Sequence, residues 1–202
     1  MTLTDDAVDG RRLRRDRNRE AVVEALLALY REGNLSPSTD DIASRAGISA
    51  RSLFRYFDDT DALVETAVAR QQEHLRPLYP LSVDASMPLT ERIDAFVAAR
   101  VRLLEAMGEV GQVARSVAAK QPRVAAELRR IRSVLREQTA GVFAPELEAM
   151  AKAERESVRA ALDVVSSWEA HHLLRSDQGL SRAAATRAMR LAIGRLLGES
   201  PS

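Results

Sequence analysis

The stretch STDDIASRAGISARSLFRYF, residues 38–57, decides the fold of this chain. Ser38 stands three residues before Asp41, a pattern close to a capping box, and this pair predicts the start of a short helix. Gly47 ends that helix. Ser49 is then a good N-cap for a second helix over the last eight residues. The stretch therefore predicts two short helices joined by a glycine turn.

The second of these helices has two different faces. At about 100° per residue, Leu53 and Phe57 fall on one face and Phe54 on its flank. The residues that project outward are Arg51, Ser52, Arg55 and Tyr56. Arginine binds guanine or phosphate with two hydrogen bonds, and hydroxyl groups bind the DNA backbone. An ordinary solvated face explains the same charges, but a helix, a glycine turn and a second polar helix favour a helix-turn-helix unit.

The flanking sequence extends this unit on both sides. Apolar residues at three- and four-residue spacing predict a helix over 16–32, which Gly33 closes. After the stretch, Asp58 or Asp59 can cap a longer helix over 60–76. Three prolines within residues 77–88 then predict a linker.

Everything after the linker also has helical periodicity, and no strand alternation is present. Further helices are predicted near 89–107, 110–120, 122–143, 148–175 and 181–198, with breaks at Gly108, at Pro122 and between Gly141 and Pro145. The predicted fold class is all-α, with an N-terminal three-helix helix-turn-helix domain followed by a larger helical domain.

Composition and charge limit the classes of protein and of site that this chain can represent. The chain has 202 residues, 30 basic and 29 acidic residues and no cysteine, so disulfides and thiolate metal sites are excluded. We expect a cytoplasmic protein, because neither a signal peptide nor a membrane span is predicted. The net charge is only +1, but basic residues are concentrated near the N-terminus. Six of the nine residues from Arg11 to Arg19 are arginine.

The sequence contains none of the motifs that are typical of enzyme active sites. Gly-rich phosphate loops and nucleophile or zinc motifs are not found. His171 and His172 are adjacent, so their side chains point about 100° apart on a helix and cannot chelate one ion together. We therefore predict no enzyme activity, no catalytic residue, no metal and no cofactor.

The run AVVEALLALYREGNLSPSTDDIASRAGISARSLFRYFDDTDAL, residues 21–63, resembles the DNA-binding domain of the TetR family of bacterial transcriptional regulators. The resemblance implies a basic flexible arm (1–15), a DNA-binding domain (16–60) and a helical ligand-binding and dimerisation domain (61–202). The residues it assigns to DNA are Ser38, Thr39, Ser49, Ala50, Arg51, Ser52, Arg55, Tyr56 and Thr60, with Arg14 and Arg15 of the arm. Thr60 replaces a lysine that usually contacts phosphate, and Phe54 replaces a tyrosine.

The resemblance also implies a homodimer that binds a palindromic operator as a repressor and is released by a small-molecule effector. The sequences of 156–175 and 181–197, rich in alanine, suit a four-helix dimer interface, although ordinary core helices of a monomer have the same pattern. The candidate pocket residues are Phe96, Met107, Val113, Phe143, Met150, Trp168 and His171. The alternatives are a DNA-binding protein without a small-molecule ligand and a helical protein-interaction adaptor.

Overall fold

The computed structural model describes residues 3–81, 83–84 and 86–199, with side chains from Arg12 onward. These residues form helices, turns and loops and contain no strand, which confirms the predicted all-α class. The chain divides into two compact units. The N-terminal unit runs to His74 and includes Gly108–Ala126, and the C-terminal unit comprises Leu75–Met107 and the residues from Glu127 onward.

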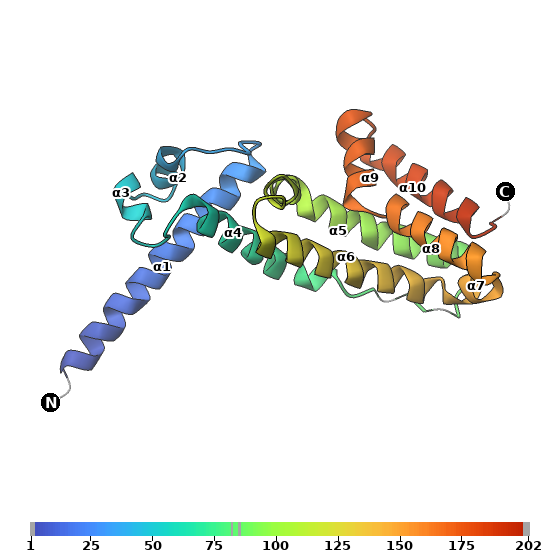
Figure 1. Ribbon diagram of the computed structural model, residues 1–202, viewed down its shortest axis with the longest axis horizontal. Helices are drawn as coiled ribbons and strands as arrows, with labels where there is room; N and C mark the ends of the chain where they lie inside the picture. The colour runs from blue at the N-terminus through green and yellow to red at the C-terminus, as the bar shows by residue number, and fades with distance from the viewer. Residues whose placement is uncertain (1–2, 82, 85, 200–202) are drawn as a thin grey trace. The chain divides into compact units, whose positions relative to one another are not determined.

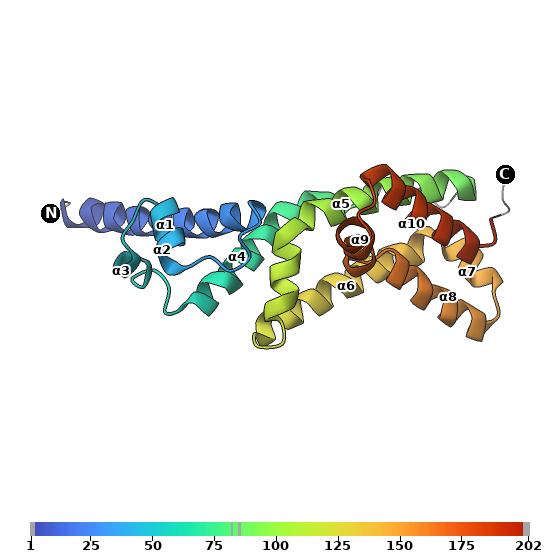
Figure 2. The ribbon, with the colours of Figure 1, turned by 90° about the horizontal axis from the view of Figure 1, so that it is seen from above.

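The N-terminal unit is built on four helices. They are α1 (Leu3–Arg31), α2 (Thr39–Arg45), α3 (Ala50–Leu53) and α4 (Thr60–Leu75). One apolar cluster, which includes Leu26, Leu27, Leu53 and Leu63, holds them together. Residues 3–15, predicted to be a flexible arm, continue α1 as helix, and this part of α1 extends past α2 and α3 in both views (Figures 1 and 2).

Helix α5 (Leu89–Val117) contributes to both units, because it bends at Gly108. Gly108 has φ 45° and ψ −143°, a backbone conformation that side-chain-bearing residues rarely adopt. The sequence predicted a break at this glycine, and the break is confirmed as a kink. Beyond the kink, Val110 and Val113 join the apolar cluster of the N-terminal unit.

The C-terminal unit contains the rest of the helices. They are η1 (Arg76–Leu78), the first part of α5, α6 (Pro122–Val142), which begins in the N-terminal unit, α7 (Ala144–Ala149), α8 (Lys152–Val165), α9 (Trp168–His172), η2 (Leu173–Asp177) and α10 (Arg182–Leu196). Phe96 and Phe143 meet edge to face at its centre, with ring centroids 5.2 Å apart. Helices α8 and α10 pack against each other (Figure 1).

The single helix predicted over 148–175 is wrong. Met150 is extended, and a second break falls at two consecutive serines, so the segment becomes α8, α9 and η2. The Ser166 hydroxyl donates to the Leu162 carbonyl (2.6 Å), and the Ser167 hydroxyl accepts from the Ala170 amide (3.1 Å) as the N-cap of α9. Serine side chains that bond to the backbone in this way compete with a continuous helix.

None of the helices in the described part of the chain combines the length and the apolarity that a bilayer span requires.

Candidate nucleic-acid interface

The N-terminus of α2 is fixed by a reciprocal cap. The Asp41 amide donates to the Ser38 hydroxyl (3.1 Å), and the Ser38 amide donates to the Asp41 carboxylate (2.9 Å). The Ser38 hydroxyl also donates to the Asp41 carboxylate (2.7 Å), and this bond, together with the one from the Ser38 amide, holds the pKa of Asp41 below its ordinary value. The capping box predicted from the sequence is confirmed, and it orients α2 ahead of the turn.

The turn between α2 and α3 depends on Gly47, which has φ +69°. Ser49 then caps α3 by accepting from the Ser52 amide (3.3 Å), and the two hydroxyl groups lie 2.9 Å apart. Regular helix ends at Leu53, earlier than the predicted Phe57. Tighter turns continue from there, because the Arg55 amide donates to the Ser52 carbonyl and the Tyr56 amide to the Leu53 carbonyl.

The outer surface of α3 and its last turns carries three exposed side chains, which we call the reading face: Arg51, Phe54 and Arg55. Neither guanidinium forms an ion pair or a hydrogen bond with any described residue. Phe54, expected on the flank of the apolar face, is 51% exposed. The underside, Leu53 and Phe57, is buried as predicted. Two free cations and one aromatic ring therefore point to solvent together.

Tyr56 and Ser52 are less available than the sequence indicated. The Tyr56 hydroxyl accepts from Asn18 Nδ2 at 2.9 Å, and its ring packs against the apolar cluster. Ser52 is half-buried beside Ser49. Tyr56 therefore fixes α3 to α1 in this structure, and a role in DNA contact would use only its remaining hydrogen-bonding capacity.

Other arginines of the same unit are held by internal contacts. Arg45 pairs with Glu32 through two bonds of 2.8 and 2.6 Å. Arg70 on α4 bonds Glu20, Glu24 and Glu73. Arg19, the last residue of the predicted arginine cluster, lies over the Phe57 ring with its Cζ 4.7 Å from the centroid, and donates to Thr66. Arg51 and Arg55 therefore differ from Arg45, Arg70 and Arg19, whose guanidinium groups already have partners.

The other residues predicted to contact DNA come before or after the reading face in the sequence, or between its residues. Ser38, Ser49 and Thr60 are exposed at the first turns of α2, α3 and α4, whereas Thr39 and Ala50 are half-buried. Arg14 and Arg15 are exposed on α1. Arg11 lies outside the described side chains. The sequence missed the exposure of Phe54, which its position beside Arg55 could have indicated.

The predicted pocket residues do not all come together. Phe96, Met107, Phe143 and Trp168 share the core of the C-terminal unit, and Met150 packs against it. Val113 belongs to the N-terminal core instead. His171 is buried with no hydrogen-bond partner for Nε2 among the described residues, and burial lowers its pKa. The described residues contain no group of three or more ligating side chains that could hold a metal ion.

Comparisons with known proteins agree with this geometry. Residues 22–67 match the model of the family described as bacterial regulatory proteins, tetR family. No curated protein matches the chain.

Solved structures are similar over most of the chain. A transcriptional regulator from Rhodococcus sp. RHA1 has a TM-score of 0.66 and 19% identity, over 91% of this chain and 99% of that one. A tetR-family transcriptional regulator from Streptomyces coelicolor has a TM-score of 0.65 and 20% identity, over 92% and 90%. A regulator from Pseudomonas aeruginosa PAO1, described as putative, has 0.64 and 17%, over 91% of both chains. At these identities the likeness concerns the fold.

Proposed function

We propose that the chain belongs to the TetR family, whose model matches residues 22–67, and that it is a sequence-specific DNA-binding regulator of transcription. In this proposal the protein acts in the cytoplasm as a repressor on a palindromic operator, has no catalytic role and is released by a small-molecule effector. In this proposal residues 16–60, with Arg14 and Arg15, contact DNA, and the helical part over 61–202 binds the effector and the second subunit.

The reading face carries the proposal. Arg51 and Arg55 have guanidinium groups without internal partners in the described residues, so no ion pair has to break before they meet a base or a phosphate. Guanidinium groups bind guanine O6 and N7 in the major groove through two hydrogen bonds. Phe54, exposed between them, offers an apolar contact of the kind that a thymine methyl group accepts.

Exposed apolar side chains support the homodimer. Val164 on α8, Leu173 on η2 and Leu191 on α10 are all large and exposed, at 64%, 47% and 58%. They belong to the helices that the sequence predicts to form the dimer interface. A second copy of the chain would bury these side chains. A dimer with two-fold symmetry also matches a palindromic operator whose two half-sites lie one turn of DNA apart.

The direct test is a selection of genomic fragments with the purified protein, followed by fluorescence-anisotropy titration of the best fragment. Arg55→Ala should weaken binding by about 1–3 kcal/mol, the cost of one bidentate or phosphate contact. Arg129→Ala, at an exposed position on α6 in the C-terminal unit, is the matched control and should leave the affinity unchanged. Equal affinity of wild type and Arg55→Ala would contradict the assigned face.

The same titration at several salt concentrations tests the arginines of α1. We propose that Arg14 and Arg15 contact phosphates, and replacing both by alanine should then reduce the slope of log K against log salt by about 0.9 for each lost contact. An unchanged slope would exclude Arg14 and Arg15 from the interface.

A further inference from the structure

The Asn18 side chain connects α1 to the hydroxyl of Tyr56, next to the reading face in the sequence. Its Nδ2 donates to the Tyr56 Oη at 2.9 Å, and both residues are half-buried. The Tyr56 ring packs against the apolar cluster of the N-terminal unit. The ring is therefore held by packing and its oxygen by Asn18, so the position of the hydroxyl is fixed.

The direction of this hydrogen bond leaves the Tyr56 hydrogen available. A phenol has one O–H donor and also accepts through its oxygen. Because the oxygen accepts from Asn18, the hydrogen points to a different acceptor, and no described residue supplies one. A phenol that accepts a hydrogen bond is also a stronger donor, since consecutive hydrogen bonds polarise one another. Phosphate oxygens are suitable acceptors for such a hydroxyl.

The side of α1 that holds the tyrosine differs in charge from the opposite side. At about 100° per residue, Arg14 and Arg15 lie within about 60° of Asn18 around the helix, one turn closer to its N-terminus. Asp16 and Glu20 lie about 160° away from Asn18, where they line a groove with residues of α4. Cations therefore surround the tyrosine side of α1, and the acids face α4.

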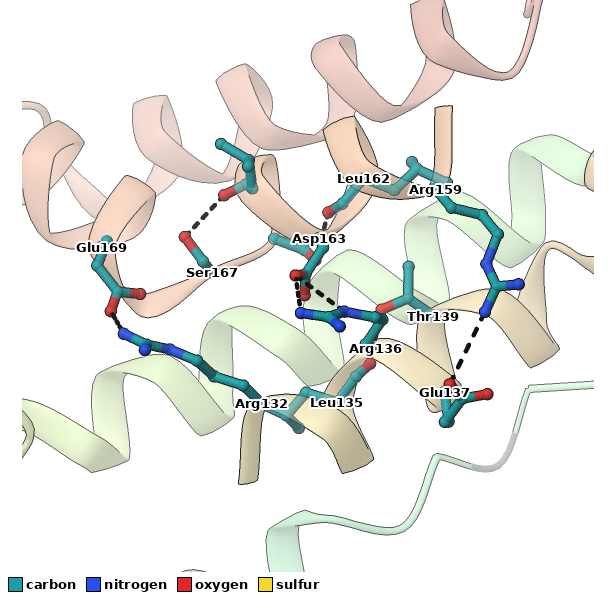
Figure 3. A network of polar contacts seen from close by, with 12 residues as sticks. Arg132, Leu135, Arg136, Glu137, Thr139, Arg159, Leu162, Asp163, Ser167 and Glu169 are labelled. Carbon is teal, nitrogen blue, oxygen red and sulfur yellow. Dashed lines mark hydrogen bonds and ion pairs between the residues drawn. The ribbon is translucent and has the colours of Figure 1, made fainter. Parts of the chain in front are cut away.

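The two cations on this side have no carboxylate partner. Exposed arginines can be held by an acid of a neighbouring helix, as Arg136 on α6 is by Asp163 on α8 (3.0 and 3.1 Å; Figure 3). Arg14 and Arg15 form no such pair with any residue that the structure describes. Their charge is therefore available to an anion that approaches the tyrosine hydroxyl.

We propose that Asn18 is a positioning residue for one phosphate contact in each half-site of the operator. It holds the Tyr56 oxygen, so that the Tyr56 hydrogen donates to a phosphate oxygen that Arg14 or Arg15 contacts as well. Asn18 itself does not touch the DNA. This inference rests on the proposed function, because it assigns a residue of α1 to the orientation of a DNA contact made by the turns that follow α3.

The test substitution is Asn18→Asp, which reverses the direction of the hydrogen bond. The aspartate carboxylate only accepts, so it would keep the link to Tyr56 but take the Tyr56 hydrogen away from the phosphate. In fluorescence-anisotropy titration of the best selected fragment, Asn18→Asp and Tyr56→Phe should each weaken binding by about tenfold or more, as expected for a lost hydrogen bond to a charged acceptor. A purely structural link would tolerate Asn18→Asp.

Two further variants separate this effect from charge and from folding. Asn34→Asp is the matched control, because it makes the same change of charge at an exposed position and keeps the bond that Asn34 Oδ1 accepts from the Ser36 amide (3.3 Å). It should bind DNA as wild type does. Asn18→Leu removes the link without adding charge, so its affinity should lie between those of wild type and Asn18→Asp. Circular dichroism should show all of these variants folded.

Single methylphosphonate substitutions in the fragment identify the phosphate itself. Neutralising the phosphate that Tyr56 contacts should weaken the binding of wild type. It should weaken the binding of Tyr56→Phe and Asn18→Asp by less, because these variants have already lost the contact. The variant in which alanine replaces both Arg14 and Arg15 should show the same reduced sensitivity at that phosphate.

Four results would overturn the proposal: wild-type affinity in Asn18→Asp, an equal loss in Asn34→Asp, weaker binding by Asn18→Leu than by Asn18→Asp, or no phosphate whose neutralisation is coupled to Tyr56 and Asn18. Failure of the proposed DNA-binding function is seen separately, because it appears as the absence of any genomic fragment that the wild type selects.

Discussion

At the scale of single residues, the arginines of the N-terminal unit are of two kinds. Arg45 and Arg70 are bonded to carboxylates, which fixes their positions and neutralises their charges locally. Arg51 and Arg55 lack such partners among the described residues. A phosphate or a guanine that meets these two groups displaces water alone, so the interaction energy is not reduced by the loss of an internal ion pair.

His171 gives a pH-dependence at the same scale. Burial, its largest cause, lowers the pKa of His171 from the ordinary 6.5, and Arg175 and His172 lower it further while Glu105 opposes them. The unfolded chain therefore binds a proton that the folded chain resists. Stability should fall as the pH drops from about 7 through the lowered pKa, by at most about 1.4 kcal/mol per pH unit.

Urea unfolding at pH 7, 6 and 5 checks this expectation. His171→Gln cannot take up the proton and should show a flatter dependence than wild type. His74→Gln, at a more exposed position on α4, is the control and should keep the wild-type slope. A wild-type slope in His171→Gln would assign the effect to other groups.

Some residue positions follow from the sequence and others do not. Rotation by 100° per residue predicted that Arg51 and Arg55 face solvent while Leu53 and Phe57 face the core. The attachment of Tyr56 to Asn18 joins residues 38 positions apart, so no local pattern contains it. For the same reason the sequence could not show that Arg19, unlike Arg14 and Arg15 on the same helix, lies over Phe57.

At the scale of elements, boundaries set by nearby residues were predictable. The start of α2 depends on Ser38 and Asp41, which are three positions apart. The break before α9 depends on Ser167, whose hydroxyl accepts from the Ala170 amide, yet the apolar periodicity across it continued and indicated one helix. Periodicity describes which face is buried, and it does not detect a side chain that replaces a backbone hydrogen bond.

Ser38→Ala should destabilise the N-terminal unit, because the Asp41 amide loses its acceptor and the Asp41 carboxylate loses the Ser38 hydroxyl as a donor, while the bond from the Ser38 amide remains. The expected cost is about 0.5–2 kcal/mol in the free energy of unfolding. Chemical denaturation followed by circular dichroism measures it. Ser36→Ala is the matched control, because Ser36 bonds to Asn34 through its amide, which the substitution keeps. Equal losses in both variants would mean that the cap contributes nothing specific.

At the scale of the whole molecule, the helical character of both halves was readable from the spacing of apolar residues, whereas the predicted linker of 77–88 lies inside the C-terminal unit. The residues that belong to each unit could not be predicted from the sequence, because Gly108–Ala126 joins the N-terminal unit through contacts between residues far apart in the sequence. The position of Val113 in that unit is one result. The division into arm, DNA-binding domain and ligand-binding domain therefore stays a functional proposal.

The proposed homodimer belongs to this scale. Leu191→Glu places a charge in the middle of the proposed interface and should shift the protein to monomer in sedimentation equilibrium at micromolar concentration. Val134→Glu, on α6 and also partly exposed, is the matched control and should remain a dimer. A wild-type monomer, or a dimer in Leu191→Glu, would exclude α10 from the interface.

The kink in helix α5 also limits which truncated fragments of this protein would keep an intact core. A truncated product that stops before the linker would keep every residue of the reading face and yet lose Val110 and Val113. Its apolar interior would then be uncovered on one side, which favours aggregation during recombinant expression. A minimal DNA-binding miniprotein made from this sequence would have to include residues 108–126, spliced back by an engineered connection.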